Sequence, residues 1–169
     1  MYYVVQVRSG DEERCMLEFG LRIKKDILQE CFVPHFEEKK KIRGKWVVQE
    51  RILFPGYMFL ETDDIDELYL NLRTIPRLTK LLGVGEYIVP LNDEEEDFLM
   101  RFGGKKHLVE MSEGIIEHSQ VRILSGPLMG MEGMIKKIDR HKRKAWLEME
   151  LFGRTQIVEV GLEVALKTI

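Results

Sequence analysis

Cysteine and histidine side chains are the first residues of this sequence to consider for metal or catalytic chemistry. Cys15, Cys31 and His35 supply ligand types that bind zinc. No Cys-x-x-Cys or His-x-x-x-His spacing accompanies them, and a fourth ligand has no candidate. Two cysteines are also too few for a disulfide framework in a chain of 169 residues. We therefore expect no metal site, and we expect both cysteines to be core or surface thiols.

An acidic run and a glycine pair are the next candidates for chemistry. The run from Asn92 to Asp97 could hold a divalent cation, but acidic residues in the first turn of a helix are explained equally well by the helix dipole. Gly83 and Gly85 are followed by Glu86 and Tyr87, so no GxGxxG phosphate loop continues from them. No convergent nucleophile, base or metal set remains. The sequence predicts neither an enzyme nor a cofactor.

Aromatic side chains form two groups that are typical of a binding protein. The first group surrounds a Pro-Gly turn and comprises Tyr3, Phe54, Pro55, Tyr57 and Phe59. Strand alternation would place Tyr57 and Phe59 on one face, where both could belong to the core. The second group, near the end of one expected helix, comprises Tyr69, Asn71, Arg73 and Thr74. It is either a solvated helix end or a set that holds unpaired bases by stacking and hydrogen bonding.

A third group is a dense basic run. Residues 136–144 read KKIDRHKRK, with six Lys and Arg residues against one acidic residue, and Trp146 follows. Such a run is usually a solvated hairpin tip. A tight basic hairpin on a small β-domain is also well shaped to grip RNA, which proteins recognise through its shape and its phosphates. The sequence leaves both interpretations open.

The overall charge at first argues against a nucleic-acid partner. The net charge is −3, from 26 basic and 29 acidic residues. Residues 1–102, however, hold 15 basic and 20 acidic side chains, whereas residues 113–169 hold nine and eight. The excess acid thus lies in the first part, and the distribution of charge matters more than its sum. No apolar run is long enough to span a bilayer and no signal peptide begins the chain, so we expect a cytoplasmic protein.

The hydrophobic periodicity predicts two domains. Strands are expected over 2–8, over 31–36, 46–54 and 57–62 as a long hairpin with a polar tip near Gly44, and around Gly83. Helices are expected from Asp11, after Asp63 and Asp64, one of which can act as N-cap, and from Asn92, which forms a capping-box pattern with Glu95. This pattern predicts an α+β domain over 1–103, in which helices cover a mainly antiparallel sheet. The polar stretch 104–114 has no clear period and predicts a linker. Short strands at 121–124, 133–138, 145–151 and 155–160 predict a small all-β domain over 115–169.

The order of these segments resembles the NusG family of transcription elongation factors over essentially the whole chain. The resemblance rests on YYVVQVRSGDE at the start, ERILFPGYMFLE (50–61), LRTIPRLTKLLG (72–83), the KOW-like VRILSGPLMGMEGMIKKID (121–139) and LFGRTQIVEV (151–160). It implies an amino-terminal NGN domain followed by a KOW domain, the latter a five-stranded SH3-like barrel. Such a protein is expected to be a monomer.

The resemblance also implies partners. The NGN domain would bind the clamp helices of RNA polymerase, and non-template DNA would lie against Tyr69, Asn71, Arg73 and Thr74. The polymerase contact would comprise Tyr3, Phe54, Pro55, Tyr57, Leu82 and Val84. Phe152 stands where housekeeping members contact ribosomal protein S10 or the termination factor Rho.

Two features favour a specialised branch of the family, the LoaP antitermination factors. Met1 lies directly before the first strand, and the KOW hairpin is strongly basic. In this branch a leader RNA hairpin recruits the KOW domain, which implies RNA binding by Lys136, Lys137, Arg140, His141, Lys142, Arg143, Lys144 and Arg154. A general NusG-type factor without specific RNA binding is the alternative. An RfaH-like helical second domain is disfavoured, because residues 121–160 carry strand patterns.

Overall fold

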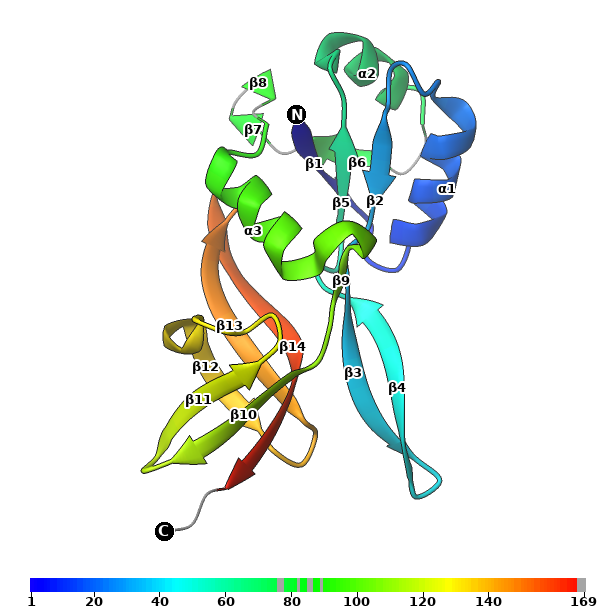
Figure 1. Cartoon of the computed structure of the whole chain (residues 1–169). Coiled ribbons are helices and arrows are strands. Elements are labelled where there is room, and N and C mark those ends of the chain that lie inside the picture. The colour runs from blue at the N-terminus through cyan, green and yellow to red at the C-terminus, as the bar shows by residue number, and fades with distance from the viewer. Residues whose placement is uncertain (76–77, 82, 85–86, 89, 167–169) are drawn as a thin grey trace. The chain divides into compact units, whose positions relative to one another are not determined.

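A computed structural model describes residues 1–75, 78–81, 83–84, 87–88 and 90–166 of the chain. Its chain is divided into two compact units. The first holds residues 1–33 and 54–97, and the second holds residues 34–53 and 98–169. Residues 34–53 lie in the sequence between two segments of the first unit but belong to the second. They form the hairpin of β3 (His35–Ile42) and β4 (Lys45–Ile52) (Figure 1).

The first unit is an antiparallel sheet with helices. Its strands β1 (Tyr2–Val7), β2 (Glu30–Phe32), β5 (Tyr57–Glu61) and β6 (Leu78–Leu81) lie in the order β2-β5-β1-β6. Helices α1 (Glu12–Arg22) and α2 (Ile65–Leu72) follow β1 and β5, and two short strands, β7 (Gly83–Val84) and β8 (Tyr87–Ile88), pair with each other. The core is apolar and includes Val5, Phe19, Met58 and Phe59, each fully buried. This confirms the predicted α+β arrangement.

The helices begin where their capping residues predict. The carboxylate of Asp64 accepts a hydrogen bond from the backbone N–H of Glu67 and caps α2. Before α3 (Asp93–Gly103), Asn92 and Glu95 each accept from the other's backbone N–H, at 2.8 and 3.1 Å. This reciprocal pair is the capping box that the sequence predicts. The acidic run is therefore explained by the start of a helix.

The second unit is built from two sheets. The hairpin strands β3 (His35–Ile42) and β4 (Lys45–Ile52) are joined by β9 (Leu108–Val109) in the order β4-β3-β9. The other sheet has the order β11-β10-β14-β13-β12. Its strands are β10 (Ser112–Glu117), β11 (Gln120–Ser125), β12 (Ile135–Asp139), β13 (Lys144–Leu151) and β14 (Arg154–Leu166), and short 3₁₀ turns cover Gly104–Lys106 and Glu132–Met134. Its core includes Leu128, Leu147, Val158 and Leu162.

The segment expected to be a linker contains regular structure. Residues 104–114 include a 3₁₀ turn, β9 and the first residues of β10. Leu108 of β9 pairs in parallel with His35 of β3, a partner more than 70 positions away, so no local period reveals the strand. The domain boundaries at residues 103 and 115 remain a prediction, since the compact units divide the chain elsewhere.

Candidate nucleic-acid interface

The turn between β12 and β13 carries the exposed part of the basic run. Arg140, His141 and Lys142 are all exposed. The carboxylate of Asp139 accepts a hydrogen bond from the backbone N–H of Lys142 at 2.9 Å, and this bond holds the pKa of Asp139 below its ordinary value. The only acidic residue of the run is therefore committed to shaping the turn, and the cationic side chains point into solvent.

Lys136 and Lys137 extend this basic surface along β12. Lys136 Nζ lies 3.4 Å from a carboxylate oxygen of Glu148, and both side chains are exposed. Exposed ion pairs of this kind contribute little free energy, so a phosphate can compete for the lysine. Lys137 Nζ lies 5.0 Å from the centre of the Trp146 ring, within cation–π range. Both ammonium groups remain available to an anion.

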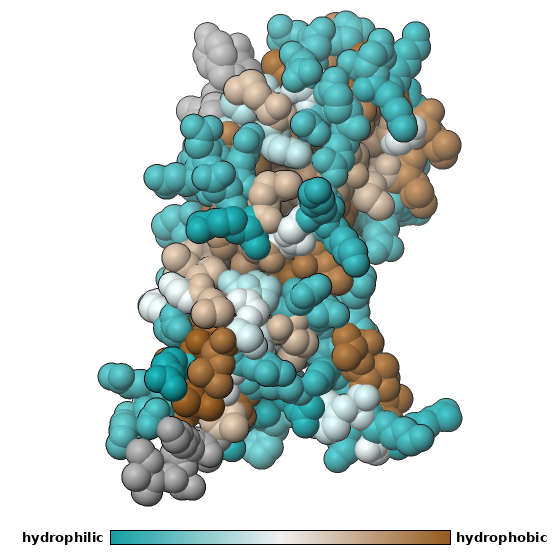
Figure 2. Space-filling model, in the orientation of Figure 1, coloured by the Kyte–Doolittle hydropathy of each residue, from teal (hydrophilic) through white to brown (hydrophobic). Residues whose placement is uncertain are grey.

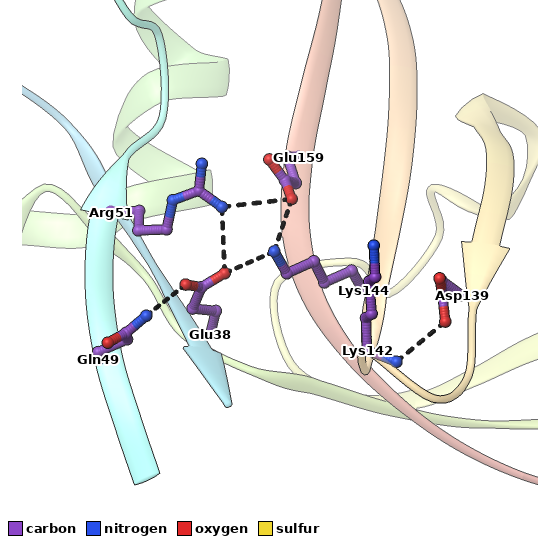
Figure 3. A network of polar contacts seen from close by, with 7 residues as sticks. All are labelled: Glu38, Gln49, Arg51, Asp139, Lys142, Lys144 and Glu159. Atoms are coloured by element: carbon purple, nitrogen blue, oxygen red, sulfur yellow. Dashed lines mark hydrogen bonds and ion pairs between the residues drawn. The ribbon is translucent and has the colours of Figure 1, made fainter. Parts of the chain in front are cut away.

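Lys144 has a different role, because it lies in a compact ion-pair network (Figure 3). Its Nζ is 2.7 Å from Glu38 on β3 and 2.8 Å from Glu159 on β14. Arg51 approaches the same two carboxylates at 3.3 and 3.5 Å, and the Gln49 amide donates to Glu38 at 2.6 Å. The side chains of Glu38 and Lys144 are only 3% and 14% exposed. Two cations and two anions balance here, so Lys144 adds no net positive charge to the surface.

The pKa values of this network follow from the same contacts. Burial opposes ionisation of Glu38, but hydrogen bonds from Lys144, Gln49 and Arg51 outweigh it and lower the pKa of the carboxyl. Burial likewise opposes the charge of Lys144, and hydrogen bonds to Glu159 and Glu38 outweigh it and raise its pKa. Both groups are therefore charged at neutral pH, and they hold β3 against β13 and β14.

Arg143 occupies an intermediate position between turn and network. Its guanidinium donates to Glu163 at 2.8 Å and lies 3.8 Å from the centre of the Trp46 ring on β4. Lys39 Nζ is 2.5 Å from the same Glu163 carboxylate, and this hydrogen bond is the main cause of the lowered pKa of Glu163. Arg143 also has a positive φ of 55°. These contacts fix the guanidinium at the border between the turn and the hairpin.

The eight residues of the expected RNA site therefore do not form one group. Arg140, His141, Lys142, Lys136 and Lys137 form an exposed surface, whereas Lys144 lies in the network and Arg143 at its edge. Arg154 pairs with Leu151 at the opposite end of β13 from Lys144. At about 3.3 Å per residue, the seven intervening steps place it roughly 20 Å away. The sequence does not reveal this division, because it gives the spacing of the basic residues but not their ion-pair partners in the fold.

An open hollow adjoins the turn. Its volume is about 470 Å³, and it is lined by the charged residues Arg140, Arg143, Glu113 and Glu163 and by apolar residues that include Ile115 and Leu124. The guanidinium planes of arginines are among the surfaces on which proteins stack unpaired RNA bases. The exposed turn is thus suited to bind phosphates, and the hollow beside it is suited to hold a base.

The expected polymerase-binding residues are mostly buried. Tyr3, Phe54 and Tyr57 are 5%, 3% and 9% exposed, whereas Pro55 is exposed. Val84 lies in β7. Leu82 lies outside the described residues. The aromatic rings thus contribute to the core of the first unit, and the polymerase contact remains a prediction for this surface.

A buried carboxylate that the sequence did not single out shapes this region. Glu12, at the start of α1, is buried and accepts hydrogen bonds from the backbone N–H groups of Gly10 and Gly56, the latter at 2.7 Å. It ties the turn after β1 to the turn before β5. Acidic residues at a helix start suggested only a helix-dipole role, so nothing local distinguished Glu12 from Glu13.

The structure places the expected DNA-binding residues together at the carboxyl end of α2. Tyr69, Arg73 and Thr74 are exposed, and the Arg73 guanidinium lies 5.9 Å from the Tyr69 ring centre. The Asn71 amide donates to the Glu67 carbonyl, and the Thr74 hydroxyl donates to the Asn71 carbonyl. The ring and the guanidinium are thus available to a base, while the amide and hydroxyl also stabilise the helix end.

Phe152 lies at the tip of the β13–β14 hairpin and is half-buried. Phe152 and Gly153 both have positive φ, 57° and 74°, which is the geometry of a two-residue hairpin turn. A bulky aromatic residue rarely adopts this conformation.

Within the described part of the chain, no group of three or more His, Cys, Asp or Glu side chains could hold a metal ion, and no helix is long and apolar enough to cross a membrane.

Comparison with known proteins identifies the family. The NusG family model, described as transcription termination factor nusG, matches residues 1–100. The chain belongs to the NusG family. The transcription termination/antitermination protein NusG of Thermus thermophilus is 30% identical over 180 residues, which cover 98% of this chain and 97% of that protein. The Haemophilus influenzae protein of the same name is 27% identical over 169 residues, and this alignment covers 94% of this chain and 89% of that protein.

The second half of the chain fits the same family. A KOW motif matches residues 119–150, which contain the basic turn between β12 and β13. A solved structure titled "Domain interaction in Thermotoga maritima NusG" matches with a TM-score of 0.63 and 25% identity, over 96% of this chain and 92% of that one. The NGN-plus-KOW architecture is therefore shown, and this NusG-family protein carries its exposed cationic turn inside the KOW motif.

Proposed function

We propose that this protein is a non-enzymatic transcription antitermination and elongation factor that binds a leader RNA hairpin through the β12–β13 turn. The observation that carries the proposal is the exposure of Arg140, His141 and Lys142 on the turn. The carboxylate of Asp139, the acidic residue of the basic run, accepts a hydrogen bond from the backbone of this turn. Cations in this position gain affinity for RNA by releasing the counterions of phosphate groups. The adjoining hollow would hold an unpaired base of the RNA loop.

The first unit would bring the factor to RNA polymerase in the cytoplasm. The exposed Pro55 is the accessible part of the expected clamp-helix contact, whereas the neighbouring Phe54 and Tyr57 are buried. Tyr69 and Arg73 on α2 would meet the non-template DNA strand by stacking. Two modest contacts on one chain give avidity that neither has alone, which suits a LoaP-like factor that loads on one transcript and persists as a monomer.

RNA binding tests this proposal. The probe is a stem-loop from the 5′ leader of the operon that contains the gene, and affinity is measured by fluorescence anisotropy at several salt concentrations. Arg140→Ala together with Lys142→Ala should weaken binding about tenfold and lower the salt slope by about 2. Lys105→Ala together with Lys106→Ala, which removes two exposed charges from the 3₁₀ turn after α3, is the matched control. Equal affinity of the two variants would show that the turn does not bind RNA.

A general NusG-type factor is the second candidate, and Phe152 favours it. Backbone strain in a bulky residue persists most often where the side chain has a function. Phe152→Asn keeps the turn, since Asn adopts positive φ readily. If ribosomal protein S10 or Rho is the partner, this variant should lose its binding in a pull-down assay while RNA affinity is unchanged.

A further inference from the structure

The tip of the β3–β4 hairpin is a second cationic surface of the same unit. Residues 39–45 read KKKIRGK, five basic residues with no acidic one. Lys40, Lys41, Arg43 and Lys45 are all exposed. Arg43 and Gly44 have φ values of 50° and 79°, so the strands are joined by a tight two-residue turn. The four side chains therefore project from a short, well-defined ribbon.

The middle of this hairpin is anchored to the five-stranded sheet. The Glu38–Lys144 network joins β3 to β13, and the contact of Lys39 with Glu163 joins β3 to β14. Gly161 of β14 lies so close to the backbone of Glu37 that a side chain there would overlap with the Glu37 carbonyl oxygen. These contacts fix the middle of the hairpin, and the tip residues 40–45 follow them along the chain.

Trp46 and Arg143 connect the two cationic surfaces. Arg143, the last residue of the β12–β13 turn, lies 3.8 Å from the centre of the Trp46 ring. In the hairpin register Trp46 pairs directly with Lys41. Directly opposed residues have Cβ atoms about 5 Å apart. Lys41, at the beginning of the hairpin tip, therefore lies near Arg143, the last residue of the turn that also carries Arg140 and Lys142.

We propose that the hairpin tip, through Lys40, Lys41, Arg43 and Lys45, is the second half of the RNA-binding surface and contacts the phosphates of the RNA stem. The proposal rests on the proposed function, because the β12–β13 turn is its other half. Glu163 and Glu38 pair with Lys39, Arg143 and Lys144 where the hairpin meets the five-stranded sheet, whereas the four cations at the hairpin tip are exposed. Two basic hairpin tips joined by the Trp46–Arg143 contact would present cations to more phosphates of a stem-loop than one turn alone.

The surface character of the hairpin agrees with this assignment. Figure 2 shows hydrophobic side chains over the middle of the hairpin and hydrophilic ones at its tip, and Val47 and Val48 are among the exposed hydrophobic residues. β4 is an edge strand, and lysines on an edge also prevent aggregation. If the lysines only prevent aggregation, removing them should not change RNA affinity, so an RNA-binding measurement distinguishes the two roles.

The experiment uses the full chain and the same leader stem-loop probe. The hairpin variant carries Lys40→Ser, Lys41→Ser, Arg43→Asn and Lys45→Ser, with Asn chosen because position 43 has positive φ. The matched control removes four exposed charges elsewhere, by Lys24→Ser, Lys25→Ser, Lys105→Ser and Lys106→Ser. We expect the hairpin variant to bind at least tenfold more weakly than the control and its salt slope to fall by about 3. Affinity within twofold of the control overturns the proposal.

Two further arms separate this proposal from the function on which it rests. If the native chain does not bind the stem-loop, or the Arg140/Lys142 variant binds it normally, the proposed function fails. If that variant loses affinity and the hairpin variant does not, only the hairpin assignment fails. Duplex DNA of the stem sequence serves as competitor, and competition equal to that of unlabelled RNA would overturn the assignment to RNA. Circular dichroism and thermal unfolding of each variant confirm that the fold is retained.

Discussion

Lys144 of β13 lies 2.7 Å from Glu38 of β3, and this buried ion pair joins the inserted hairpin to the five-stranded sheet. The side chain of Glu38 is almost fully inaccessible, so its charge depends on partners from other strands. Removing one partner of a buried pair is costly because the other charge stays buried and uncompensated. Lys144, the last residue of the basic run, is thus primarily a structural residue.

Lys144→Met should lower the free energy of unfolding by about 2–3 kcal/mol, less than for an isolated pair because Arg51 still contacts Glu38. Lys142→Met, two residues away on the exposed turn, should change it by less than about 0.5 kcal/mol. Urea denaturation at neutral pH measures both. Equal effects of the two variants would contradict the structural role of Lys144. RNA-binding measurements on the same two variants would show which lysine contributes to the proposed RNA affinity.

Stability should fall in acid because the pKa values of Glu38 and Glu163 are lowered in the folded chain. Below the ordinary value of 4.5 the unfolded chain binds protons that the native carboxylates do not, so the free energy of unfolding rises with pH in this window. The contribution is complete above about 4.5 and is lost as pH decreases through the native values. Glu38→Gln should therefore be less stable than the native chain at pH 7, and this difference should shrink progressively as the pH decreases below 4.5. A constant difference between the two at all pH values would exclude this linkage.

Gly161→Ala should destabilise the second unit, because the added Cβ would overlap with the Glu37 carbonyl oxygen and the Met111 sulfur. The methionine side chain can move, but the β3 backbone cannot without breaking its pairing. We expect a loss of about 2 kcal/mol, the usual range for overpacking. Gly133→Ala is the control, since no atom lies within 4 Å of its added Cβ. Thermal unfolding compares the two, and a normal melting temperature for Gly161→Ala would show that β3 does not cross β14 so closely.

Glu12→Ala should destabilise the first unit by about 1–3 kcal/mol, because the buried N–H of Gly56 would lose its acceptor. Glu13→Ala, the neighbouring exposed carboxylate, is the control. Hydrogen exchange should show faster exchange of the Gly56 amide in the Glu12 variant alone. Unchanged protection of that amide would show that the carboxylate is not its partner.

Much of the fold could be predicted from the sequence because its elements are encoded locally. Asp64 before α2 and the Asn92–Glu95 pair before α3 predict helix starts that the hydrogen bonds confirm. Gly44 predicts the turn of the β3–β4 hairpin in the same way. Each of these signals depends on neighbours within four residues, and a sequence displays such neighbours directly.

The sequence alone determined the family, the order of the elements and the presence of a basic turn, because motifs, periodicity and capping residues are local properties. Only the tertiary structure decided which cations remain exposed and which are neutralised. It separated Lys142 from Lys144, buried Phe54 and Tyr57 while leaving Pro55 exposed, and placed Trp46 against Arg143. The physical reason is that burial and ion pairing depend on partners such as Glu38 and Glu163, which are brought near these residues only by the folding of distant strands.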